Sequence, residues 1–313
     1  MKFYMGMDIG GTKCAVVLSE KKSSSIADKI RFETKSERGW QAVVEELLTS
    51  AQTLIERNLT DDDEIISCGV SCGGPLDSNK GIIMRPPNLP DWDNVPLADI
   101  VSARLGVPCF VRNDADACAL AEWQFGAGKG TKNMIFLTFG TGMGAGLILD
   151  GKLYSGTSGT AGEVGHIRLS DDGPVGYGKA GSFEGYCSGG GMANLGKKML
   201  SLYNGETELT MGDMSAKAIA EAAKNGDKLA LAIYRKSGEK LGQGLSILID
   251  IFNPQRIVIG SIFQRSGELL IESMNEVIEK EALSVNAAQC EIVPAILGDE
   301  IGDYAAIGVA MEG

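Results

Sequence analysis

The chain has 313 residues, of which 44% are hydrophobic and 22% charged, so it has the composition of a globular protein and about twice the usual size of one domain. Acidic residues exceed basic ones by 41 to 29, and the formal net charge is −12. Because this charge repels phosphate backbones and acidic membrane surfaces, we expect no nucleic-acid partner and no membrane partner. The start of the chain lacks an apolar leader and no later run reaches roughly 18 apolar residues, so we expect a cytoplasmic protein.

The first part of the chain is predicted to alternate strands with turns and helices. Residues 2–8 and the apolar run CAVVL flank a glycine turn, and this pattern is typical of a strand, a tight turn and a second strand. Further strands are expected at 26–34, 65–71 and 108–112. One helix is expected at 40–57, where apolar residues recur every three or four positions, and another between Pro96 and Gly106.

The layout then repeats. Residues 134–149 again form an apolar strand, a glycine turn and an apolar strand. The two turns, Asp8 to Lys13 and Thr138 to Gly144, start 130 positions apart, as expected if two related halves each offer one loop to a shared cleft. Downstream we expect helices at 215–225, 227–252, 267–282 and 302–311 and strands at 256–260 and 290–294.

The first turn reads DIGGTK, from Asp8 to Lys13. Glycines without a Cβ let main-chain N–H groups approach a polyphosphate, Thr12 and Lys13 can add a hydroxyl and a cation, and Asp8 can face Mg²⁺. The same letters also suit an ordinary glycine hairpin at a surface.

The second turn contains GTGMGA, which matches the dinucleotide fingerprint Gly-x-Gly-x-x-Ala. That fingerprint requires a helix after the glycines, whereas the run LIL followed by Asp150-Gly151 predicts a strand and a turn. We therefore interpret residues 138–144 as a second phosphate-binding hairpin.

Two acidic residues, Asp114 and Asp116, stand where a strand ends and a helix begins. Either could be only a helix cap. Beside bound phosphates, such a carboxylate could instead accept the proton of an attacking hydroxyl, as phosphoryl transfer to an alcohol requires. The proline-rich stretch 85–92 offers Asn88 and Trp92 for gripping a polyol, or it is simply a rigid loop.

A single histidine, His166, follows Glu163 and precedes Glu184. A lone histidine is more often structural than functional, so it carries little meaning without its context. The seven cysteines form no Cys-x-x-Cys pair, and we expect most of them to be reduced core residues.

These pieces, in this order, resemble the ROK family of repressors, open reading frames and kinases. The resemblance extends over the whole chain through eight collinear segments: DIGGTK at 8–13, GVSCGGPLD at 69–77, PPNLPDW at 86–92, NDADACALAE at 113–122, FGAGKG at 125–130, FGTGMGAG at 139–146, GTAGEVGHI at 159–167 and IVIGS at 257–261. It implies an α/β, two-domain actin-like ATPase fold, a duplicated ribonuclease H-like unit with a cleft between the domains. The expected small domain is 1–115 with a last helix at about 300–313, and the expected large domain is 116–299.

The resemblance also implies roles for individual residues. Asp114 matches the general base, and Asp8 would position Mg²⁺ through water. Phosphate and nucleotide contacts would come from Asp8, Gly10, Gly11, Thr12, Lys13, Thr138, Gly140, Thr141, Gly142, Gly260 and Ser261. Sugar contacts would come from Gly74, Asn88, Asn113, Asp114, Glu163, His166 and Glu184.

One departure from the family concerns a structural zinc, which the histidine of most members ligates with three cysteines. With the family's run anchored on Glu184, Val175, Tyr177 and Ser182 stand at the cysteine positions. One imidazole without thiolates cannot make a tetrahedral zinc site. We therefore expect no zinc, and we expect His166 to serve the sugar, with Tyr177 packing where the metal would have held the loop.

The implied activity is transfer of the ATP γ-phosphoryl group, with Mg²⁺, to a hexose hydroxyl, with the 6-hydroxyl of glucose or a related aldohexose as the leading expectation. Allose, mannose, fructose, N-acetylglucosamine and N-acetylmannosamine use similar motifs. Family members are commonly dimers, so a homodimer is expected. A DNA-binding repressor is disfavoured because Asp8 follows so few residues, while a catalytically silent sugar-binding sensor stays open as the alternative.

Overall fold

The computed structural model describes residues 1–23 and 25–312, which form two compact units. Unit 1 contains Met1–Gly130, Leu153–Ala161 and the segment that begins at Leu297. Unit 2 contains Thr131–Lys152 and Gly162–Ile296. None of the helices formed by the described residues has the length and apolar character needed to cross a membrane.

Unit 1 is built on a five-stranded sheet with the order β3-β2-β1-β4-β7. Strands β1, β2 and β3 pair antiparallel, whereas β4 is parallel to β1 and β7 is parallel to β4. The strands are β1 (Lys2–Ile9), β2 (Lys13–Glu20), β3 (Asp28–Glu33), β4 (Glu64–Cys72) and β7 (Cys109–Asn113). Because β1, β4 and β7 run in the same direction, their carboxyl ends lie at one edge of the sheet.

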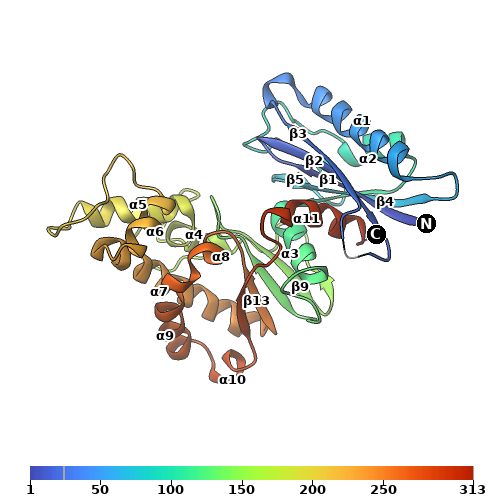
Figure 1. Cartoon of the computed structure of the whole chain (residues 1–313). Coiled ribbons are helices and arrows are strands. Elements are labelled where there is room, and N and C mark those ends of the chain that lie inside the picture. The colour runs from blue at the N-terminus through green and yellow to red at the C-terminus, as the bar shows by residue number, and fades with distance from the viewer. Residues whose placement is uncertain (24, 313) are drawn as a thin grey trace. The chain divides into compact units, whose positions relative to one another are not determined.

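Helices cover both faces of this sheet (Figure 1). The helices of unit 1 are α1 (Trp40–Asn58), α2 (Leu97–Leu105), α3 (Asp114–Gln124) and α11 (Ile301–Ala310). Met5 and Met7 belong to the core that α1 and α2 complete. On the other face α11 packs so closely that a Cβ added to Gly69 would lie 2.2 Å from the main-chain nitrogen of Ala310, so only glycine fits at this crossing.

Unit 2 repeats the same sheet. Its order is β10-β9-β8-β13-β14, with β8 (Met134–Leu137), β9 (Ala145–Leu149), β10 (Lys152–Leu153), β13 (Arg256–Ile259) and β14 (Glu291–Pro294). Numbered along the chain, both sheets have the strand order 3-2-1-4-5, and in both the glycine turn joins the first strand to the second. The structure therefore confirms the internal repeat that the sequence predicts.

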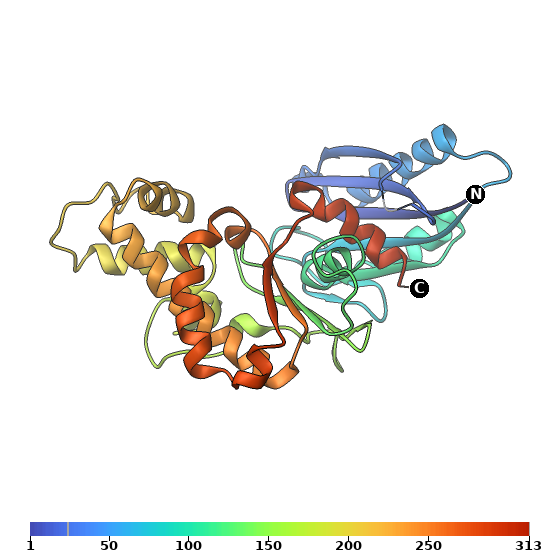
Figure 2. The same ribbon diagram turned by 60° about the horizontal axis from the view of Figure 1, so that its bottom comes forward.

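The helices of unit 2 include the long α7 (Lys228–Phe252), which runs beside α9 (Ile271–Glu281) (Figure 2). The others are α4 (Phe183–Tyr186), α5 (Gly189–Leu200), α6 (Ala216–Lys224), α8 (Ile262–Ser266) and α10 (Ser284–Ala287). The short elements of the two units are β5 (Leu76–Asp77), β6 (Ile82–Ile83), β11 (Val175–Gly176), β12 (Lys179–Ala180), η1 (Ser36–Arg38), η2 (Val164–His166), η3 (Gly267–Leu269) and η4 (Gly298–Glu300).

Three of the differences from expectation concern helices. Helix α5 is absent from the prediction because its sequence opens with three glycines, yet Ser188 caps it by accepting a hydrogen bond from the Gly191 N–H at 2.9 Å. The single helix expected at 267–282 is divided into η3 and α9. Helix α3 belongs to unit 1, where it packs on α11, although the expected small domain ended at residue 115.

Candidate functional site

A cavity of about 220 Å³ in unit 1 lies at the carboxyl ends of the parallel strands. Six of the predicted site residues line it: Asp8, Gly10, Gly11, Gly74, Asn88 and Asp114. They come from the end of β1, the turn after it, the segment after β4, the proline-rich loop and the start of α3. The parallel register of β1, β4 and β7 thus brings together residues that are more than one hundred positions apart in the chain.

The first glycine turn is a closed hairpin in which the Gly10 N–H donates to the Lys13 carbonyl at 3.1 Å. Thr34, directly after the neighbouring strand β3, stabilises this hairpin, because its hydroxyl donates to the Gly10 carbonyl at 2.6 Å. A Cβ on Gly11 would lie 2.7 Å from the Cβ of Asn88, so the turn abuts the proline-rich loop. Thr12 and Lys13 are exposed on the turn and are not part of the cavity lining.

Asp114 is the first residue of α3 and is open to the cavity. It is not the helix cap: Asn113 takes that role, its side-chain oxygen accepting from the Asp116 N–H at 2.8 Å. The loss of water around Asp114 raises the pKa of its carboxyl group, and the Ala115 N–H, which donates to Oδ1 at 2.9 Å, opposes this rise. The carboxylate is therefore free to accept a proton from a bound group.

Asp8 is the last but one residue of β1 and lies beside α11, where a Cβ on Gly302 would lie 2.5 Å from its Oδ2. Burial, reinforced by the charge of Asp303, raises the pKa of Asp8 to about 6. The nearby charges of Lys13 and Arg31 lower it in part. A cation beside such a buried carboxyl group would stabilise its ionised form.

The structure adds residues that the sequence did not single out and removes one that it did. Cys72 lines the cavity between Asp8 and Asp114, and its burial together with these two charges raises the pKa of its thiol strongly. Trp92, offered for gripping a polyol, is fully buried in the core of unit 1 and is unavailable for that role. Thr34 was missed because a lone threonine after a strand has no distinctive pattern.

The second glycine turn lies in unit 2 between β8 and β9. The Thr138 hydroxyl accepts from the Gly144 N–H at 2.8 Å, and the Thr138 N–H donates to the Gly144 carbonyl at 3.0 Å. Strand β9 follows directly, which confirms that GTGMGA is not a dinucleotide fingerprint. Gly140, Thr141 and Gly142 form the tip of the turn.

The turn at Gly260 and Ser261 lies against this second glycine turn. A Cβ on Gly140 would lie 3.4 Å from the Ser261 hydroxyl, and the Ile262 N–H donates to the Phe139 carbonyl at 2.9 Å. Ser261 has φ 54° and ψ −108°, a conformation that favours glycine. The residues of unit 2 that are predicted to contact the nucleotide therefore lie together at these two turns.

Glu184 connects the second glycine turn to the segment that holds the histidine. Its Oε2 accepts from the Met143 N–H at 3.0 Å. A Cβ on Gly165 would lie 3.2 Å from the Cβ of Glu184 and 2.4 Å from the Met143 carbonyl, so η2 packs tightly on both. The structure thus brings Glu184 near His166, while Glu163 lies exposed at the start of η2.

The residues around His166 do not fit a zinc ion. Ser182 caps α4 by accepting from the Gly185 N–H at 3.1 Å, Val175 is 53% exposed, and Tyr177 lies edge-on to the histidine ring. None of these side chains supplies a thiolate. Among the described residues, no group of three or more histidine, cysteine or acidic side chains could hold a metal ion.

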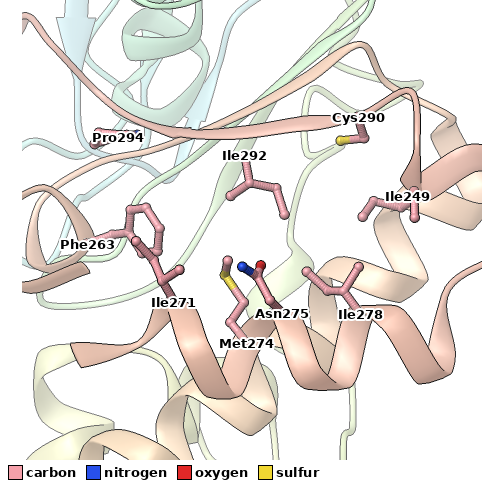
Figure 3. Close-up of a pocket in the computed structure, with 10 residues that line it drawn as sticks. Ile249, Phe263, Ile271, Met274, Asn275, Ile278, Cys290, Ile292 and Pro294 are labelled. Atoms are coloured by element: carbon pink, nitrogen blue, oxygen red, sulfur yellow. The ribbon is translucent and has the colours of Figure 1, made fainter. Parts of the chain in front are cut away.

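Two further cavities occur in unit 2, and none of the predicted site residues lines either of them. The first, of about 260 Å³, lies between α9 and β14 and is lined mainly by apolar side chains, with the amide of Asn275 directed into it (Figure 3). The second, of about 510 Å³, lies along α5 and α7. The first contains no charged side chain, so its lining does not suit a phosphate group.

Comparison with known proteins gives consistent results along the whole chain. Residues 4–311 match the model of the ROK family. The chain is 31% identical to a glucokinase of Thermotoga maritima over 313 residues, which is 98% of this chain and 97% of the relative. It is 30% identical to a xylose repressor of Caldicellulosiruptor bescii, with coverage of 89% of this chain and 70% of the repressor.

Solved structures agree with the fold. A ROK family glucokinase from Streptomyces griseus, in complex with glucose and AMPPNP, superimposes with a TM-score of 0.75 and 29% identity, covering 99% of this chain and all of that one. The repeated sheet with strand order 3-2-1-4-5 is that of the actin-like two-domain ATPases. The chain belongs to the ROK family and has its fold.

Proposed function

We propose that this chain is an ATP-dependent sugar kinase that transfers the γ-phosphoryl group to a hexose hydroxyl, the 6-hydroxyl of glucose or a related aldohexose. The observation that carries the proposal is the cavity of unit 1, in which Asp114 shares one lining with Asp8, two glycines of the first turn and Asn88. A phosphoryl transfer to an alcohol needs a base, a phosphate cradle and a grip on the alcohol. The residues that line this cavity have the chemistry that all three tasks require.

Asp114 is the proposed general base. Its raised pKa makes the ionised carboxylate a stronger proton acceptor than an aspartate with an ordinary pKa. It would take the proton of the sugar hydroxyl as that oxygen attacks phosphorus. Asn113 supports this role, because its side chain caps α3 and the Asp114 side chain does not have to do so.

The glycine turns are the proposed phosphate cradles. Gly10, Gly11, Thr12 and Lys13 would act from unit 1, and Thr138, Gly140, Thr141 and Gly142 from unit 2. Main-chain N–H groups on such turns donate to phosphate oxygens without a side chain in the way. Gly260 and Ser261, packed on the second turn, are proposed to contact the adenosine.

Mg²⁺ fits this chain at Asp8. Magnesium is usually held by one or two carboxylates together with substrate phosphates, so a larger acidic cluster is not required. When bound it would neutralise charge that develops on the transferred phosphoryl group. The buried carboxylate of Asp8, proposed to act through a water molecule, lies in the same cavity lining as Gly10 and Gly11.

Sugar hydroxyls are proposed to be held by Gly74, Asn88 and Asn113 of unit 1 and by Glu163, His166 and Glu184 of unit 2. Carboxylates and imidazole suit this task because they accept or donate hydrogen bonds to vicinal hydroxyls. We also propose that the chain acts on small molecules, not nucleic acid, in the cytoplasm, and that it forms a homodimer.

The second candidate function is a sugar-binding regulator without catalysis, favoured by the similarity to a xylose repressor. The two functions differ at Asp114. A regulator needs the sugar contacts but not a base, so Asp114→Asn, which removes the base but keeps a side-chain oxygen that can accept a hydrogen bond from the sugar, would leave its response to sugar unchanged.

The test is magnesium-dependent ADP release from ATP in the presence of aldohexoses, fructose and N-acetylhexosamines, with Asp114→Asn as the control. A kinase gives release with one or a few sugars, and the Asn variant loses it by about 10²–10⁴-fold while the sugar still raises its melting temperature. If a sugar raises the melting temperature of the wild-type chain but none stimulates ADP release, the regulator is the correct function.

A further inference from the structure

A two-residue turn joins β11 to β12 in unit 2, close to the only histidine of the chain. Its residues are Tyr177, with φ 45°, and Gly178, with φ 77°. Both values lie in the left-handed region, as a tight hairpin turn of this kind requires. Glycine, asparagine and aspartate are the residues that normally occupy such positions, so a tyrosine with φ 45° is held there at a conformational cost.

Burial does not explain this tyrosine. Its side chain is 80% exposed, among the most exposed of the large hydrophobic residues. The contact that its ring makes is with His166, at a centroid distance of 4.9 Å and an interplanar angle of 75°. An edge-to-face arrangement at this distance is the favourable geometry for two aromatic rings.

The main chain of His166 is well anchored, whereas its ring is not. The Lys179 ammonium donates to the His166 carbonyl at 2.7 Å, and the His166 N–H donates to the Glu163 carbonyl at 3.2 Å. No described residue makes a hydrogen bond to the imidazole. The aromatic contact that the structure gives for this imidazole is the one with Tyr177.

We propose that Tyr177 is a positioning residue that fixes the ring plane of His166, in place of a zinc ion for which this loop supplies no thiolate. Resting on the proposed function, the consequence is that Tyr177 sets how the imidazole meets a sugar hydroxyl and thereby tunes sugar affinity. It acts through His166 and takes no part in the transfer of the phosphoryl group.

The matched variants are Tyr177→Asn and Tyr177→Phe. Asparagine tolerates the left-handed conformation and so keeps the turn while it removes the ring. Phenylalanine keeps the ring and removes only the hydroxyl. Replacement by Val or Ile is unsuitable, because a β-branched residue would strain the turn and confuse a folding defect with a loss of the ring contact.

The first measurement is independent of catalysis. Because His166 is the only histidine in 313 residues, the imidazole C–H groups give a single set of signals in a proton–carbon NMR spectrum. We expect these signals to move in Tyr177→Asn, through loss of the tyrosine ring current, and to stay near their wild-type positions in Tyr177→Phe. Identical spectra for all three proteins would overturn the proposal.

The second measurement separates affinity from turnover. With the sugar that the kinase assay identifies, KM for the sugar is expected to rise about tenfold in Tyr177→Asn, while kcat and KM for ATP change less than twofold, and Tyr177→Phe behaves as wild type. An unchanged sugar KM in an active Asn variant contradicts the proposal and leaves the kinase function intact. If no sugar is phosphorylated, the kinase function fails, and the imidazole signals alone decide the ring contact.

Discussion

The carboxylate of Glu184 accepts a hydrogen bond from the Met143 N–H at 3.0 Å, so a proposed sugar ligand also fastens a proposed phosphate turn. The same oxygen lies 2.9 Å from where a Cβ on Gly142 would stand. The proposed sugar contacts and the proposed nucleotide contacts of unit 2 thus share one side chain. Because of this relationship, substitutions of Glu184 and of Glu163, the other proposed acidic sugar ligand of unit 2, are expected to have different effects.

We expect Glu184→Ala to raise KM for both sugar and ATP, each by roughly tenfold, because the Met143 N–H loses its partner at about 1–2 kcal/mol. Glu163→Ala should raise KM for the sugar alone, since Glu163 is exposed and no hydrogen bond joins it to the turn among the described residues. Initial-rate kinetics in both substrates measure this. Equal effects of the two substitutions on KM for ATP would contradict the shared role.

A second prediction concerns Ser261, whose φ of 54° and ψ of −108° are unfavourable for a residue with a side chain. Ser261→Gly should relieve this strain and raise the free energy of unfolding by about 1 kcal/mol, after subtraction of the larger entropy of glycine in the unfolded chain. Ser261→Ala keeps the strain and serves as the control. Urea unfolding compares them, and a glycine variant no more stable than the alanine variant would show that the turn is unstrained.

The third prediction is a pH dependence of stability. Asp116 is fully buried and its Oδ2 accepts from the Ser155 hydroxyl at 2.9 Å, whereas its Oδ1 has no hydrogen-bond partner among the residues that the structure describes. Burial, opposed in part by the Ser155 hydroxyl, raises its pKa to about 6. The pKa of Asp116 in the folded chain lies above the unfolded value of 3.8. The protonated carboxyl group therefore contributes fully to the free energy of unfolding below about pH 4, and this contribution is lost as the pH rises through about 6.

Asp116→Asn removes the free-energy cost of ionising a buried carboxyl group, so the variant should be more stable than wild type at pH 8 by on the order of 2 kcal/mol. The difference should shrink as pH falls toward 5, where the wild-type carboxyl is largely protonated. Unfolding free energies at several pH values between 5 and 8 measure it. A difference that does not depend on pH would mean that Asp116 titrates as an ordinary aspartate.

The fourth prediction tests the close crossing of α11 over the sheet of unit 1. Gly69→Ala would place a Cβ 2.2 Å from the Ala310 nitrogen and 2.3 Å from the Ala306 carbonyl. Since both are main-chain atoms that cannot rotate away, we expect a loss of about 3 kcal/mol or more. Gly212→Ala, with no atom within 4 Å of the added Cβ, is the control. Thermal unfolding of the two variants should separate them, and similar melting temperatures would show that α11 can shift.

The strands that flank the glycine turns could be predicted because apolar runs end at glycines in both halves, and the internal repeat follows from that pattern alone. The cap of α3 could not be assigned, since Asn113, Asp114 and Asp116 all favour such a position and only the structure shows which oxygen accepts the helix N–H. The candidate site residues could be proposed from the resemblance to a known family. The hydrogen bond between Glu184 and Met143 could not be predicted in this way, because it depends on how η2 and α4 pack.

Some features stayed hidden for physical reasons. Helix α5 begins with glycines, which have low helix propensity, and it forms because Met192 and Leu195 are buried. Trp92 resembles a ligand contact in sequence, yet its large apolar surface is used by the core. Tertiary burial overrides local preference in both cases.

The discontinuity of unit 1 has a consequence for biosynthesis. Helix α11, which packs on β1, β4 and α3, follows unit 2 in the chain, because every residue of unit 2 precedes Leu297. During translation the amino-terminal sheet emerges first but lacks the helix that covers one of its faces. Unit 2 can therefore complete its core on the ribosome before unit 1 does, and one face of the early sheet stays uncovered until α11 has been synthesised.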